Sequence, residues 1–218
     1  MLPSLVDFLL FSLLGSGPSW VMSGALFQEL PYFQQHLPEG LCLASRMTMS
    51  ANSGLILAFL YYLYNRYIRP VPNVIAIPFL IVLVSFAMMA CSVWFDLTYD
   101  GTSFALYFFM FLAGCVGNLM YQILYPFLVN YRAECMIAAR AGNDFTNAVI
   151  ASVALIQSPG STSIRFSPSL FMFSVGVYLL VFPLAAYIYI YIYEIGLKLE
   201  FRQSSFLLVD KSSQVHSF

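Results

Sequence analysis

Long apolar runs, separated by short polar connections, recur along the whole chain. Six of them have the roughly 20 mainly apolar residues that a helix needs to cross a bilayer. They are Leu5–Phe27, Ser45–Tyr64, Val74–Phe95, Ser103–Val129, Met136–Gln157 and Ser169–Tyr191. Charged residues make up only 9% of the 218 residues, too few to cover the surface of a soluble domain. We therefore predict an all-α integral membrane protein built as a six-transmembrane-helix bundle.

The basic residues predict the orientation of this bundle. Arg66, Arg69 and Arg132 fall in connections on one side, together with the tail that follows the last span. Short loops rich in Lys and Arg stay on the cytoplasmic side, so we expect both termini to be cytoplasmic. Residues 1–195 are then the transmembrane domain, and residues 196–218 are a cytoplasmic tail that either lies on the membrane surface or is disordered.

The stretch YIYIYIY, residues 187–193, alternates as a strand does. A lone strand in lipid would leave its backbone groups without partners. We therefore predict that these residues continue the last helix, with tyrosines where the helix meets the lipid headgroups.

Residue patterns typical of enzymes are missing. The two histidines, His36 and His216, are far apart, and the sequence has no HExxH, GxSxG or Walker-type loop. We expect no enzymatic activity, no cofactor and no metal site. The net charge of −1 gives no reason to expect a nucleic-acid partner. The sequence also has no segment that resembles a nucleotide-binding domain, which an ATP-driven transporter would need.

Polar residues cluster inside two of the predicted spans. In the fourth, Asn118 and Gln122 are four residues apart and share a helix face, with Tyr121 beside them. In the fifth, the polar residues are Arg140, Asn143, Asp144 and Asn147. Two interpretations remain open. These side chains line a cavity for a flat, neutral, hydrogen-bonding solute, or they join helices, with Arg140 and Asp144 neutralising each other.

The first span is interrupted by GSGPSW, residues 15–20. Pro18 lacks a backbone donor, so the break could expose backbone groups to a substrate, as broken helices do in transporters. Alternatively, Gly15, Gly17, Ser19 and Ser23 allow a neighbouring helix to approach closely. The sequence supports both interpretations equally.

A polar stretch, FQELPYFQQHLPEG at residues 27–40, follows the first span. We interpret it as the extracellular mouth of the bundle, where Glu29 and Glu39 shape the entry. The alternative, at least as strong for Glu39, is that these carboxylates cap a helix end.

Two segments resemble the eukaryotic riboflavin transporters of the solute-carrier class. The first is SWVMSGALFQELPYFQQHLPEG, residues 19–40, and the second is PFLVNYRAECMIAARAGNDFTNAVIASVALIQ, residues 126–157. The positions that match the family's motifs are Trp20, Glu29, Pro31, Pro38, Glu39, Gly40, Gly142 and Gln157. The chain differs where the family has Asn-Gly and Trp before Glu-Leu-Pro, and where it has Gly-Glu-Gly in place of Gly142, Asn143 and Asp144.

The resemblance covers residues 10–195 and implies one half of a major-facilitator-like transporter. It implies facilitated transport of riboflavin or a related flavin-like solute at the plasma membrane, with a homo-oligomer or a second half-transporter completing the machinery. Together with the polar helix faces, it leads us to expect the solute at Trp20, Phe27, Glu29, Asn118, Tyr121, Gln122, Asn143, Asp144 and Asn147. The alternative is a non-transporting truncated paralogue that acts as a membrane interaction subunit.

Overall fold

A computed structural model describes residues 5–17, 19–69, 71–160 and 164–215, with side chains described up to Tyr193. Its elements are α1 (Leu5–Ser16), α2 (Val21–Gln28), α3 (Leu30–His36), the short 3-10 helix η1 (Gly40–Cys42), α4 (Leu43–Ser53), α5 (Leu55–Tyr67), α6 (Asn73–Trp94), α7 (Phe104–Leu128), α8 (Ala133–Gln157) and α9 (Pro168–Val215). The described residues form no named strand, so the predicted all-α fold is confirmed.

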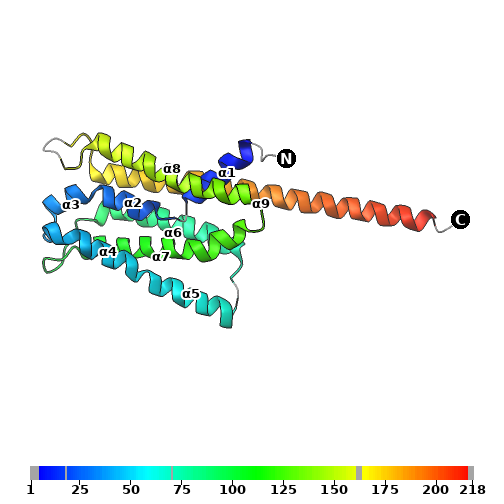
Figure 1. Ribbon diagram of the computed structural model, residues 1–218, viewed down its shortest axis with the longest axis horizontal. Helices are drawn as coiled ribbons and strands as arrows, with labels where there is room; N and C mark the ends of the chain where they lie inside the picture. The colour runs from blue at the N-terminus through cyan, green and yellow to red at the C-terminus, as the bar shows by residue number, and fades with distance from the viewer. Residues whose placement is uncertain (1–4, 18, 70, 161–163, 216–218) are drawn as a thin grey trace.

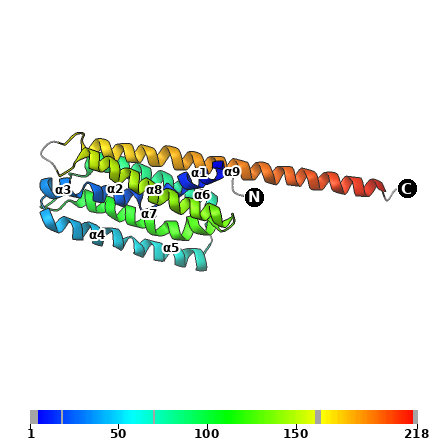
Figure 2. The same ribbon diagram turned by 45° about the horizontal axis from the view of Figure 1, so that its top comes forward.

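The helices run side by side along one axis, and the connections gather at its two ends (Figures 1 and 2). One end holds α3, η1 and the connections α6–α7 and α8–α9; we call it the α3 end. The other end holds the N-terminal start of α1 and the connections α5–α6 and α7–α8, and α9 extends beyond the bundle on that side. The most extensive contacts join α6 to α9, α1 to α8 and α4 to α7.

Three described helices are long and apolar enough to span a membrane: α6, α7 and the Pro168–Tyr193 part of α9. The bent pair α1 and α2 makes a fourth if it counts as one span. The predicted span 45–64 corresponds to two separate helices, α4 and α5. The predicted span 136–157 corresponds to α8, which carries Arg140, Asn143, Asp144 and Asn147. The number six is therefore a prediction that length and hydropathy do not confirm.

The first predicted span consists of two helices, α1 and α2, inclined by 63°. Pro18 lies outside the described residues. The hydroxyls on both sides of the break bond to nearby carbonyls: Ser19 Oγ donates to Ser16 O over 3.0 Å, and Ser23 Oγ donates to Trp20 O over 2.8 Å. These hydroxyls satisfy backbone carbonyls at the break, so fewer carbonyls are free to bind a ligand.

The small residues of α1 lie at its crossing with α8. A Cβ atom on Gly15 would overlap the Ala139 backbone, and one on Gly142 would overlap the Ser12 backbone. Ser12 Oγ also donates to Ala138 O over 3.0 Å. At Gly15, therefore, the structure supports the close-packing interpretation of the sequence.

The tyrosine-rich stretch is helical, as predicted, because it lies within α9. Tyr189, Tyr191 and Tyr193 are exposed, whereas Tyr187 is buried and its hydroxyl donates to Val74 O of α6 over 3.1 Å. The α9 backbone remains helical to Val215. A separate cytoplasmic tail at 196–218 stays a prediction, and residues 216–218 lie outside the described residues.

Candidate functional site

Helix α2 lies between α7 and α8 and contacts both. Trp20, at its N-terminus, packs against α7: a Cβ on Gly117 would lie 2.8 Å from the indole carbons. On the side toward α8, a Cβ on Gly24 would lie 2.7 Å from Asn147 Oδ1. The first, fourth and fifth predicted spans therefore meet at α2, and they bring Trp20 and Asn147 to the same short helix.

The amide donors of this region are occupied by backbone carbonyls. The Nδ2 atoms of Asn118 and Asn147 donate to carbonyls one turn earlier in their own helices, over 2.8 and 3.0 Å. Gln122 Nε2 donates across to Ala58 O of α5 over 3.0 Å. The buried oxygens Gln122 Oε1 and Asn143 Oδ1 have no partner among the described residues. Gln122 thus joins two helices, as one interpretation predicted, while two acceptors remain available to a donor.

Arg140 and Asp144 form the predicted ion pair one turn apart on α8, with Nε and Oδ2 separated by 3.2 Å. Asn143 Nδ2 donates to Asp144 Oδ1 over 3.0 Å. The Arg140 guanidinium also interacts with Tyr121 and Tyr125 of α7, whose rings stack with centroids 5.4 Å apart. Long side chains therefore bridge α7 and α8.

We call Trp20, Asn118, Tyr121, Asn143, Asp144 and Asn147 the polar face. Tyr121 and Asp144 are exposed, Asn143 is buried and the other three are half-buried. Four cavities are described; one of about 930 Å³, lined mainly by α4 and α5, includes Gln122, and none includes the other eight predicted site residues. Tyr121 and Asp144 therefore form the exposed part of the polar face, and Asn143 forms its buried part.

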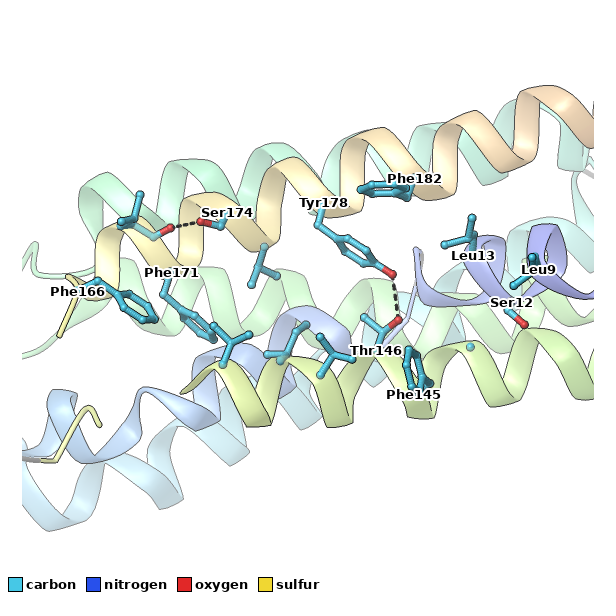
Figure 3. Close-up of a pocket in the computed structure, with 16 residues that line it drawn as sticks. Leu9, Ser12, Leu13, Phe145, Thr146, Phe166, Phe171, Ser174, Tyr178 and Phe182 are labelled. Atoms are coloured by element: carbon cyan, nitrogen blue, oxygen red, sulfur yellow. Dashed lines mark hydrogen bonds between the residues drawn. The ribbon is translucent and has the colours of Figure 1, made fainter. Parts of the chain in front are cut away.

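A cavity of about 660 Å³ lies between α1, α8 and α9 (Figure 3). Its lining is mainly apolar, and its hydroxyls are already bonded: Tyr178 Oη to Thr146 Oγ1 over 3.0 Å, and Ser174 Oγ to Leu170 O over 2.6 Å. Such a lining offers few free groups to a hydrogen-bonding solute. Sequence reasoning missed this cavity, because its residues come from three helices and share no motif.

Phe27 and Glu29 are not part of the polar face, and their surroundings differ from it. Phe27 is half-buried and packs against the hydrophobic core. Glu29, between α2 and α3, is 0% exposed, and neither carboxylate oxygen has a hydrogen-bond partner among the described residues. Burial raises the pKa of this carboxyl to about 7, and the nearby Gln157 amide opposes that shift. The predicted role of Glu29 in shaping an open mouth does not agree with this burial.

Glu39 caps the start of α7. Its carboxylate accepts hydrogen bonds from Ser103 N, from Ser103 Oγ over 2.8 Å and from Tyr107 Oη over 2.9 Å. Partial burial raises the pKa of Glu39, but these bonds outweigh burial and hold the pKa below its usual value. These bonds agree with the capping interpretation of Glu39, since the carboxylate lies at the N-terminus of a helix.

The family described as solute carrier family 52, riboflavin transporter, matches residues 3–169. No curated protein and no solved structure matches the chain significantly. The matched range includes the break in the first span, the Glu29 and Glu39 region and both polar helices, α7 and α8. The chain belongs to solute carrier family 52, the riboflavin transporters.

Proposed function

We propose that this chain binds riboflavin or a related flavin on the polar face and moves it across the membrane by facilitated transport without ATP. The observation that carries the proposal is the meeting of α2, α7 and α8, which brings Asn147 of α8 against the same short helix, α2, that begins at Trp20, within a riboflavin-transporter sequence. An indole can stack on a flat ring system, and amides can bond its polar edges.

The polar face needs a covering partner. An exposed ion pair and an exposed tyrosine on helices of the bundle are unfavourable in contact with lipid tails, so they must face protein or water. We propose that a second copy of the chain, or a second half-transporter, covers the face and encloses the solute. Alternating access then follows from rocking of the two bundles.

The proposed location is the plasma membrane, with both termini cytoplasmic. Arg66 lies in the last turn of α5 and Arg132 directly precedes α8, so these arginines lie at the end of the bundle opposite α3. The start of α1 lies at that same end, and α9 extends beyond it. A basic end that also carries both termini supports a cytoplasmic placement.

Uptake of radiolabelled riboflavin by proteoliposomes that contain only this chain tests the proposal. We expect saturable uptake, reduced about fivefold by Trp20→Ala, since loss of ring stacking removes roughly 1 kcal/mol. The matched control is Trp94→Ala, which removes an exposed tryptophan at the end of α6, where it lines a cavity that includes no residue of the polar face. Equal effects of the two variants would contradict the assignment of Trp20.

The second candidate function is a non-transporting interaction subunit. The bond from Gln122 Nε2 to Ala58 O favours it, because this donor already joins α7 to α5, and the amide donors of Asn118 and Asn147 are occupied within their own helices. Absence of uptake in every oligomeric form, combined with stable capture of a second membrane protein through the polar face, would support this alternative.

A further inference from the structure

The least compensated polar group of the described residues lies at the α3 end, outside the polar face. Glu29 is 0% exposed, both of its carboxylate oxygens lack hydrogen-bond partners, and no described cation forms an ion pair with it. A charged carboxylate in that position would lose its hydration without any replacement. Its burial therefore requires an explanation.

The burial results from the turn between α2 and α3. The backbone of Glu29 stays near helical geometry, with φ −82° and ψ −1°, and its carbonyl accepts a bond from Phe33 N over 3.0 Å. Phe33 is fully buried and lies 5.5 Å, centroid to centroid, from the ring of Phe95. This apolar packing fixes the turn that places the carboxyl inside the bundle.

Gln157, the last residue of α8, supplies the polar group nearest to the carboxyl. Its side chain is also 0% exposed; Nε2 donates to Phe166 O over 3.2 Å, and Oε1 has no partner. Three buried acceptor atoms, two on Glu29 and one on Gln157, therefore share a single remaining amide hydrogen. The site has too few donors and, if Glu29 is ionised, an uncompensated negative charge.

The other titratable groups on the surrounding elements do not compensate it. On α3, His36 is exposed, and its Nδ1 lies 2.9 Å from Tyr32 O. On the α8–α9 connection, Arg165 is exposed, and its backbone N–H donates to Gln157 O over 3.3 Å. Asp96 is exposed just beyond the end of α6. Asp144 of α8 is paired with Arg140. Tyr107 of α7 is bonded to Glu39.

We propose that Glu29 and Gln157 form a proton-binding site, occupied in the conformation seen here, and that opening of the α3 end releases the proton. One proton from solution binds the Glu29 carboxylate, removes its charge and adds a donor to the cluster. When the α3 end opens, water reaches the carboxyl and its affinity for the proton falls to that of an ordinary glutamate. Closing the end therefore takes up one proton, whether or not a flavin is bound.

The electrostatics of Glu29 agree with this geometry. Burial raises its pKa from 4.5 to about 7, so near neutral pH the closed form binds the proton and the hydrated form does not. The Gln157 amide lowers the pKa, which means that its removal strengthens proton binding.

Infrared spectroscopy of the purified full chain in lipid nanodiscs tests the proposal without measuring transport. We expect a protonated-carboxyl band that disappears as the pH rises, with a midpoint near 7. The band is lost in Glu29→Gln, which mimics the neutral acid, and the midpoint moves upward in Gln157→Leu. The matched control is Glu39→Gln, which changes a carboxyl at the same end that is ionised at this pH and leaves the band intact.

Hydrogen exchange links the proton to the opening. After correction for intrinsic rates, exchange of the amides in residues 28–36 and 154–160 accelerates above the midpoint in the native chain and stays flat in Glu29→Gln. The proposal is overturned if Glu29→Gln leaves the band unchanged, if the midpoint lies near 4.5, if sodium at constant pH removes the band, or if exchange responds to pH equally in both proteins.

Discussion

Single residues at the α3 end show how similar sequence patterns lead to different chemistry. Glu29 and Glu39 lie ten positions apart in the same polar stretch. Glu39 reaches the start of α7, where hydroxyl and backbone donors stabilise its charge, whereas Glu29 enters the bundle without donors. The pKa values of the two carboxyls therefore move in opposite directions from the same reference value.

The buried carboxyl predicts a pH dependence of stability. Because the folded form binds a proton at Glu29 more tightly than the unfolded chain, this contribution is complete below pH 4.5 and is lost as the pH rises through about 7. The loss is on the order of 3 kcal/mol, at about 1.4 kcal/mol per pH unit. Thermal unfolding in detergent between pH 4.5 and 8 measures it. We expect Glu29→Gln to flatten the profile; an unchanged slope would contradict the burial.

The Glu39 cap predicts a loss of stability that does not depend on Glu29. Glu39→Ala leaves Ser103 N without its acceptor, and we expect a cost of about 1–2 kcal/mol, which is typical of a lost helix cap. The same unfolding measurement at pH 7 tests it. The matched control is Asp96→Ala, which removes an exposed carboxylate near the end of α6. A similar loss in both variants would argue against a specific cap.

Among the elements, the crossing of α1 and α8 depends on glycine because the backbones themselves are in contact. A Cβ at Gly142 overlaps the Ser12 backbone, which cannot move aside as a flexible side chain can. We expect Gly142→Leu to cost about 3 kcal/mol or more, at the upper end of overpacking effects, and to lower the yield of folded protein. Ala141→Leu, at an exposed position next to it, is the control. Monodisperse, heat-stable Gly142→Leu protein would contradict the crossing.

Helix α8 shows why the number of spans is harder to predict than their type. It is 25 residues long, but its middle turns carry Arg140, Asn143 and Asp144. A window of hydropathy averages these residues with the apolar ones and cannot tell which face of the helix they occupy. In the structure Arg140 interacts with Asp144 and with Tyr121 and Tyr125 of α7, so part of this polar face is satisfied by side chains that a hydropathy window does not consider.

For the whole molecule, the open polar face predicts self-association or a partner. If a second copy covers the face, light scattering in mild detergent gives a mass of at least twice 24.5 kDa for the protein component. We expect Tyr121→Lys to shift the protein to the monomer, because it places an unpaired charge in the covered face. Phe108→Ala, another exposed aromatic of α7, is the control. A monomer that transports riboflavin alone would contradict this arrangement.

The sequence by itself determined the environment and the helices. With so few charges, the apolar runs must face lipid or one another, and the positions of α6, α7 and α8 follow their apolar patterns closely. It also predicted the Arg140–Asp144 pair, because residues four apart on a helix are neighbours wherever the helix lies.

Only the tertiary structure decided which polar groups meet. Trp20 and Gly117, or Glu29 and Gln157, are separated by about a hundred residues or more, and local periodicity carries no information about such pairs. Their meeting depends on how helices cross, and backbone contacts such as that of Gly142 with Ser12 set the crossing. For the same reason the burial of Glu29 could not be read from its polar neighbours, since the apolar packing of Phe33 and Phe95 produces it.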